Sequence, residues 1–137
     1  MATKTSSPTP TYLVTGAAGF IGARFVESCK AKGIACLADP VLDPIHFGFM
    51  TSLERYAELR RARPEIEILM GTGNLTELTD ADSQGVTAIL LGICSELQIR
   101  DVLVVQVSPH TRRTIQEHDA RCDLLRRVWI RPQVVER

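Results

Sequence analysis

Short apolar runs alternate along the chain with longer segments in which apolar residues recur at helical spacing. The runs predict four strands, expected at Tyr12–Thr15, Ile34–Ala38, Ile66–Met70 and Val102–Val107. The last run is almost continuously apolar, which is typical of a parallel strand that is covered on both faces.

A helix is predicted after each of these runs. The first ends at Gly33 and the second at Pro64, and Thr51 and Glu54 have the spacing of a capping box at the start of the second. The third has the clearest apolar face, formed by Val86, Ile89, Leu90, Ile93, Cys94 and Leu97. The fourth opens at Ser108-Pro109 and places Ile115, His118, Cys122, Leu125 and Trp129 on one side.

Two further predictions concern the loop after the second strand and the surface of the second helix. The Asp39-Pro40 and Asp43-Pro44 pairs disfavour helix before each proline, so residues 39–49 are expected to form a long loop. The arginines of the helix that follows are expected to point mostly outward, namely Arg55, Arg60, Arg61 and Arg63.

The alternation of strands and helices predicts an α/β fold of four β-α units around a parallel sheet. We expect a Rossmann- or flavodoxin-like three-layer sandwich, with half of a TIM barrel, completed by dimerisation, as the alternative. After a disordered tail at 1–11, residues 12–130 are expected to form a single α/β domain, with a Rossmann-like βα unit at 12–34 and a half-barrel-like segment at 35–130. Apolar strand edges left open by a half barrel make a homodimer the expected assembly.

The charge balance narrows the classes of partner. Sixteen Lys and Arg offset sixteen Asp and Glu, so no net field favours nucleic acid or an anionic membrane, and a small-molecule ligand is expected. The polar opening lacks the apolar core of a signal peptide, and no run reaches the ~20 apolar residues of a membrane span, which predicts a cytoplasmic protein. Four widely spaced cysteines indicate buried thiols, and no metal site is expected.

A glycine-rich turn joins the first predicted strand to the first helix. Gly16, Gly19 and Gly22 have the spacing that allows a tight turn, close approach of a pyrophosphate and close packing of the helix. The alternative is that these glycines have only a structural role, which is to form the tight turn.

The string Tyr12-Leu-Val-Thr-Gly-Ala-Ala-Gly-Phe-Ile-Gly-Ala-Arg24 resembles the N-terminus of extended short-chain dehydrogenase/reductases, the NAD-dependent epimerase/dehydratase family. Over residues 12–34 the resemblance implies NAD or NADP as cofactor. It also implies a binding site made of Gly16, Gly19, Phe20, Ile21, Gly22 and, on the ribose, Asp39. The family's catalytic Tyr-x-x-x-Lys is missing, since the tyrosines are Tyr12 and Tyr56, and Arg60 stands four residues after Tyr56.

Residues 35–127 resemble the C-terminal half of dihydropteroate synthase-like TIM-barrel proteins. The resemblance rests on Ala38-Asp-Pro-Val-Leu-Asp-Pro-Ile-His-Phe-Gly-Phe49, Met70-Gly-Thr-Gly-Asn-Leu-Thr-Glu-Leu-Thr-Asp-Ala-Asp82 and Gln106-Val-Ser-Pro-His-Thr-Arg-Arg113. It implies a pterin ligand and a substrate site made of Asp39, Thr72, Asn74, Ser108 and Arg112. His110, Ser108 and Arg112 are weak catalytic candidates, His110 having no assigned partner, and helix capping by Thr76, Thr79 and Ser108 is the alternative.

The two family resemblances meet near residues 34–39, which indicates that the sequence is a chimera. The leading hypothesis is a domain that binds a nucleotide or a phosphate at the first glycine-rich turn without dehydrogenase activity. The alternatives are a fragment of a dihydropteroate synthase-like pterin or one-carbon enzyme, and a chimeric scaffold without an evolved ligand.

Overall fold

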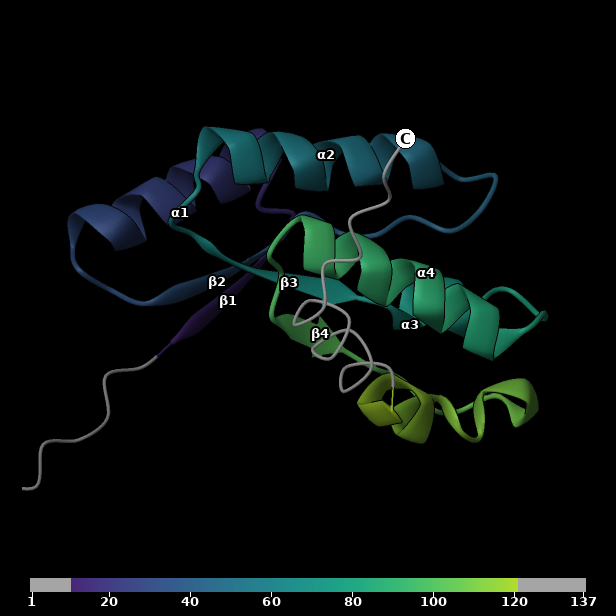
Figure 1. Ribbon diagram of the computed structural model, residues 1–137. Coiled ribbons are helices and arrows are strands. Elements are labelled where there is room, and N and C mark those ends of the chain that lie inside the picture. Colours follow the sequence, from purple (N-terminus) through teal and green to yellow (C-terminus); the bar gives the residue numbers. More distant parts are fainter. Residues whose placement is uncertain (1–10, 121–137) are drawn as a thin grey trace, which may run out of the picture.

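A computed structural model of the chain describes residues 11–120 and shows one parallel sheet (Figure 1). Its strands are β1 (Tyr12–Thr15), β2 (Cys36–Asp39), β3 (Glu67–Gly71) and β4 (Asp101–Leu103). They lie in the order β1-β2-β3-β4, and each pair of neighbours is parallel.

Helices separate the strands along the chain. These are α1 (Phe20–Ala31), α2 (Phe49–Ala62), the single-turn α3 (Gly73–Thr76) and α4 (Ser83–Glu96). A 3-10 turn, η1 (Pro109–Thr111), follows β4 and leads into helical residues 114–120. The predicted α/β fold with four parallel strands and helices between them is therefore confirmed.

One face of the sheet carries the core. Val14, Ala38 and Ile68 occupy paired positions on β1, β2 and β3, and all three are buried. Val26 of α1 and Tyr56 of α2 belong to the same buried cluster, and so does Leu90 of α4. These three helices thus share a core with the same face of the sheet.

Consecutive strand order explains this one-sided packing. A right-handed crossover to the next strand places its helix on one face, and repeating it in the same direction places every helix there. A doubly wound sheet instead reverses its strand order at a switch point, and none of the described crossovers reverses. The order is the one found within a β/α barrel, and on the other face Leu13 and Leu103 are each 51% exposed.

The strand boundaries agree best with the prediction in β1 and least in β4. β1 has the predicted bounds, and β2 and β3 each begin and end one or two residues late. β4 ends at Leu103, and Val107 beyond it is 83% exposed, so the prediction of a strand to residue 107 covered on both faces was wrong. β4 has only β3 as a neighbour among the described strands, and the residues after Leu103 leave the sheet.

The start of α2 also differs from the prediction. The helix begins at Phe49 after Gly48, whose φ of 110° lies in the left-handed region, and no side chain caps it. Thr51 lies inside the helix, so the predicted capping box was wrong. The predicted loop between β2 and α2 is confirmed.

The region between β3 and β4 holds an additional helix and a different cap. α3 was not predicted, and the cap of α4 is Asp82, whose side chain accepts a hydrogen bond from the backbone N–H of Gln84 at 3.1 Å. Ile89 was placed on the inner face of α4 but is 65% exposed, because the helix buries Leu90 and Leu91 instead.

The cysteines of the described chain are largely buried, as predicted. Cys29 and Cys94 are buried and Cys36 is half-buried, where burial and the neighbouring Cys29 thiol raise its pKa. Cys122, Leu125 and Trp129 of the last predicted helix lie outside the described residues. Within residues 11–120, no helix combines the length and the apolar character needed to cross a bilayer.

Two helical glycines provide a matched test of the packing between α1 and the first turn. A Cβ on Gly22 would lie 2.3 Å from the carbonyl oxygen of Gly16, whereas a Cβ on Gly92 of α4 would meet nothing within 4 Å. We expect Gly22→Ala to lower the free energy of unfolding by about 1–3 kcal/mol through overpacking. Gly92→Ala should raise it by about 0.5–1 kcal/mol, since alanine favours helix over glycine. Urea denaturation of both variants measures the difference, and equal effects would contradict the close packing.

Candidate functional site

The glycine-rich turn after β1 is built from one left-handed backbone position and one close contact. Gly16 has a φ of 67°, which favours glycine, and its carbonyl oxygen accepts a hydrogen bond from the Gly19 N–H at 2.9 Å. Gly22 then brings the first turn of α1 against Gly16. The chain therefore enters α1 directly from the carboxyl end of β1.

The N-terminus of α1 is open to a ligand. Its cap, Gly19, supplies no side-chain hydrogen bond, and Phe20 and Ile21 are 81% and 82% exposed. The Arg24 guanidinium lies 5.7 Å from the centre of the Phe20 ring. A hollow of about 430 Å³ adjoins this end of the helix, and Gly19, Phe20, Arg24 and Arg63 are among its lining residues.

Asp39 lies beside this turn because β1 and β2 are paired. Thr15 and Asp39 are partners in register at the ends of the two strands. The backbone N–H of Ala17 donates to the carbonyl oxygen of Asp39 at 3.0 Å. Gly16–Gly22 and Asp39, predicted as parts of one cofactor site, are therefore adjacent.

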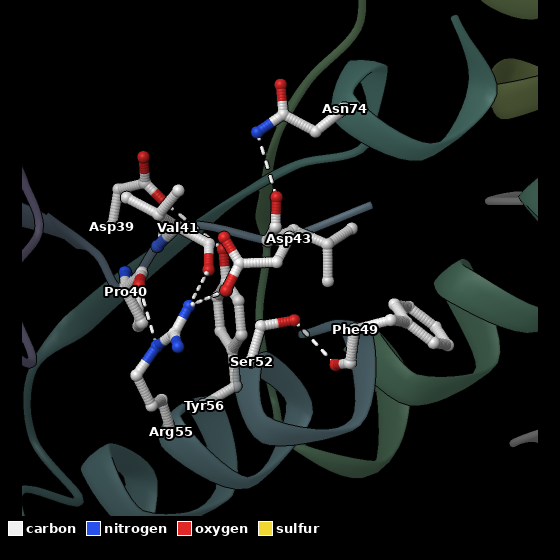
Figure 2. A network of polar contacts seen from close by, with 10 residues as sticks. Asp39, Pro40, Val41, Asp43, Phe49, Ser52, Arg55, Tyr56 and Asn74 are labelled. Carbon is white, nitrogen blue, oxygen red and sulfur yellow. Dashed lines mark hydrogen bonds and ion pairs between the residues drawn. The ribbon is translucent and has the colours of Figure 1, made fainter. Parts of the chain in front are cut away.

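The Asp39 carboxylate joins β2 to α2 (Figure 2). Its Oδ1 atom accepts hydrogen bonds from the Val41 N–H at 2.9 Å and from the Tyr56 hydroxyl at 3.0 Å. Tyr56 is fully buried. Burial, and then the negative charge of Asp39, raise the pKa of Tyr56 far above its ordinary value, so this hydroxyl keeps its proton.

Arg55 fixes the loop that follows Asp39 (Figure 2). Its guanidinium donates to the carbonyl oxygens of Pro40 and Val41 at 3.3 and 2.8 Å and pairs with Asp43 at 2.7 Å. Arg60 likewise donates to the carbonyl oxygen of Leu97 at 2.7 Å. The prediction that Arg55 and Arg60 point outward was wrong, because both donate hydrogen bonds to backbone carbonyl oxygens of neighbouring loops.

The end of β3 contributes one accessible and one inaccessible candidate. The side-chain amide of the exposed Asn74 donates to the carbonyl oxygen of Leu42 at 2.8 Å, which links α3 to the β2 loop. Thr72 is fully buried, and its hydroxyl lies 3.0 Å from Nε2 of the buried His118. Thr72 therefore packs within the protein and does not face a substrate.

Glu77 organises the segment after β4. Its carboxylate accepts hydrogen bonds from the backbone N–H groups of Val107 and Ser108, at 2.8 and 2.9 Å, and from the Thr111 hydroxyl at 2.7 Å. The Ser108 side chain first, then the Val107 N–H and the Thr111 hydroxyl, lower the pKa of Glu77 to about 2. The segment is thus held against the end of α3.

The weak catalytic candidates lie on this segment but do not converge. His110, to which the sequence assigned no partner, donates through Nε2 to the carbonyl oxygen of Thr76 at 3.0 Å, and its Nδ1 lies 3.6 Å from Oδ1 of Asp80. Arg112 is exposed. In the described part of the chain, no group of three His, Cys, Asp or Glu side chains is placed to hold a metal ion.

Three residues of this region were not predicted as part of a site: Tyr56, Arg55 and Glu77. Tyr56 lacks the lysine that the catalytic motif requires, and Arg55 was expected to point mostly outward. Tyr56 lies 17 positions after Asp39 in the sequence, and Val107 lies 30 positions after Glu77. No local pattern indicates either contact, because each depends on how the elements pack.

Comparison with known proteins finds a relative of unknown role. The chain is 34% identical over 83 residues to an uncharacterized protein of Methanocaldococcus jannaschii. The matched segment is 59% of this chain and 16% of that protein, so the chain spans only a small part of its relative. No family model and no solved structure matches the chain. The fold therefore defines the class, an α/β protein with a four-stranded parallel sheet.

The Glu77 contacts predict a pH-dependent contribution to stability. The folded-state pKa is lowered from 4.5 to about 2, so the stabilisation is present above pH 4.5 and is lost as the pH falls through about 2. Glu77→Gln should lower the melting temperature at pH 7 and have little effect near pH 2. Glu54→Gln, at an exposed position of α2, should change neither value. Thermal melts across this pH range measure both, and a pH-independent loss in Glu77→Gln would contradict the assignment.

Proposed function

We propose that the chain binds a nucleotide of the NAD type, or another phosphorylated small molecule, at the paired ends of β1 and β2. The observation that carries the proposal is the adjacency of the Gly16–Gly22 turn and Asp39, joined by the hydrogen bond from Ala17 to the Asp39 carbonyl. This combines a phosphate-binding feature and a ribose-binding feature at neighbouring strand ends.

The phosphate would bind at the N-terminus of α1. The first N–H groups of a helix have no partner within it, and its dipole favours negative charge at this end. Gly19 offers no competing side chain, and Arg24 supplies positive charge in the adjoining hollow, where Arg63 is paired with Glu27. Its volume of about 430 Å³ falls in the range of small-molecule pockets.

Asp39 would accept hydrogen bonds from the ribose hydroxyls. Val41 and Tyr56 hold its Oδ1 atom, while Oδ2 accepts no hydrogen bond from a residue of the described chain. A carboxylate fixed in this way is pre-oriented, which lowers the entropic cost of ligand binding.

We propose binding without hydride transfer. The short-chain dehydrogenase resemblance requires a tyrosine with a lysine four residues later, and Tyr56 is instead followed by Arg60. Tyr56 is also fully buried and bonded to Asp39, with a raised pKa, which makes it unsuited to proton transfer.

A pterin-binding role is the second candidate. The consecutive strand order and the contact of Asn74 with the Asp39–Phe49 loop favour it, since both fit the resemblance of residues 35–127 to a dihydropteroate synthase-like barrel. In that case the sequence would join parts of two families, and the ligand would lie nearer Asn74 than the first turn.

The decisive experiment compares two variants of Phe20, the exposed first residue of α1. Phe20→Asp and Phe20→Asn both remove the ring, but the aspartate places a negative charge where the phosphate would bind. We expect Phe20→Asp to weaken NAD binding at least tenfold relative to Phe20→Asn, a difference of about 1.4 kcal/mol. Asp is favourable at a helix N-terminus, so folding should be preserved.

Amide NMR titration of the full chain with NAD measures this effect. Saturable shifts at residues 16–22 and 39 that weaken in Phe20→Asp support the nucleotide site, and Asp39→Asn should weaken them as well. Shifts with a pterin but not with NAD, unaffected by Phe20→Asp, would favour the second candidate. A dispersed spectrum that neither compound moves would leave a scaffold without an evolved ligand.

A further inference from the structure

Within residues 11–120, the sheet ends in two edges that no other strand pairs with. Among the described strands, β1 pairs only with β2 and β4 pairs only with β3. Proteins normally protect such edges with charged residues, prolines or bulges. β1 carries no charged residue and no proline, and β4 carries only Asp101, with apolar residues continuing past its end to Val105.

Exposed apolar side chains gather along the β1 edge. Tyr12 and Leu13 are about half exposed, and Phe25 stacks edge-on against Tyr12 with ring centres 6.3 Å apart. Ile21 lies one helical turn before Phe25. The opposite side of α1 faces α2, since Glu27 pairs with Arg63 there. We call Tyr12, Leu13, Ile21 and Phe25 the β1 patch.

A second group lies at the β4 edge. Leu103, Val105 and Val107 follow one another along and after the strand, and Ile115 lies in the helical turn beyond η1. Their exposed fractions run from 36% at Val105 to 83% at Val107. We call these four residues the β4 patch.

We propose that two copies of this chain close into an eight-stranded parallel barrel, with the β4 edge of each copy against the β1 edge of the other. Eight tilted strands enclose an interior that side chains fill completely, and four strands in consecutive order with all helices on one face form half of that arrangement. A twofold axis along the barrel makes both contacts identical, so no edge remains open.

The available apolar area is of the right size. From their exposed fractions, the β1 and β4 patches together present on the order of 800 Å² per copy, close to the roughly 800 Å² that each partner buries in a standard interface. Leu13 and Leu103, on the sheet face away from the helices, would enter the barrel interior. The net charge of zero means that two copies do not repel each other.

Sedimentation equilibrium of the full chain without nucleotide tests the proposal. We expect a discrete species of twice 15.1 kDa. Ile21→Lys and Val107→Asp, at residues more than four-fifths exposed, should each weaken the dimer at least tenfold without disturbing the core. Phe47→Lys and Ile89→Asp alter residues that are 81% and 65% exposed and belong to neither patch, and both should leave the dimer intact.

Mixing the two weakened variants tests which edges meet. In a mixed dimer, one contact joins two unaltered patches, and the other places the introduced lysine of one copy beside the introduced aspartate of the other, so dimerisation should be restored. A monomeric wild-type chain, an open polymer, a dimer unaffected by either substitution, or one lost only in Ile21→Lys would each overturn the proposed closure.

Discussion

Successive crossovers in one direction determine most of what this molecule can do. Because each β-α unit adds its strand beside the previous one, α1, α2 and α4 all cover the same face of the sheet. That face is packed as one core, from Val14 on β1 to Met70 on β3. The same constraint leaves the other face without a helix from these crossovers, and it leaves apolar residues exposed at both edges.

Asp39 is the polar counterpart of this core. Its carbonyl oxygen holds the first turn through Ala17, and its carboxylate holds the following loop through Val41 and α2 through Tyr56. A hydrogen bond to a charged group contributes about 1.5–3 kcal/mol in typical proteins. The candidate site is therefore built into the packing of β1, β2 and α2, and its geometry does not depend on a mobile side chain.

Local patterns in the sequence account for the elements but not for their long-range contacts. The alternation of apolar runs and helical periodicity predicts the parallel α/β fold, and turn glycines predict where α1 begins. The capping-box spacing of Thr51 and Glu54 misleads because Gly48 already turns the chain into α2 with a left-handed φ. The Asp82 cap is missed because several acidic and threonine residues compete for that position in the sequence.

The candidate site residues also fall into those that the sequence indicates and those that depend on how distant elements pack. The resemblance of residues 12–34 implies one site for Gly16–Gly22 and Asp39, and the pairing of β1 with β2 makes them adjacent. Thr72 stands at a strand end, where a ligand could reach it, yet the packing of His118 covers it. Glu77 acts on residues 107–111 only because β3 and β4 are neighbours, and strand pairing is not visible in a single sequence.

The two proposals are linked by the position of β1. It carries the Gly16–Gly22 turn at its carboxyl end and is also the edge strand that would meet the partner's β4. In a parallel barrel all strand ends point to one mouth, so the turn would lie beside the segment that follows β4 in the other copy. A ligand held between them would bind the dimer more tightly than the monomer, and by linkage it would strengthen dimerisation by the same factor. The unpaired strand edges and the N-terminus of α1 would then contribute to one ligand site formed by the dimer.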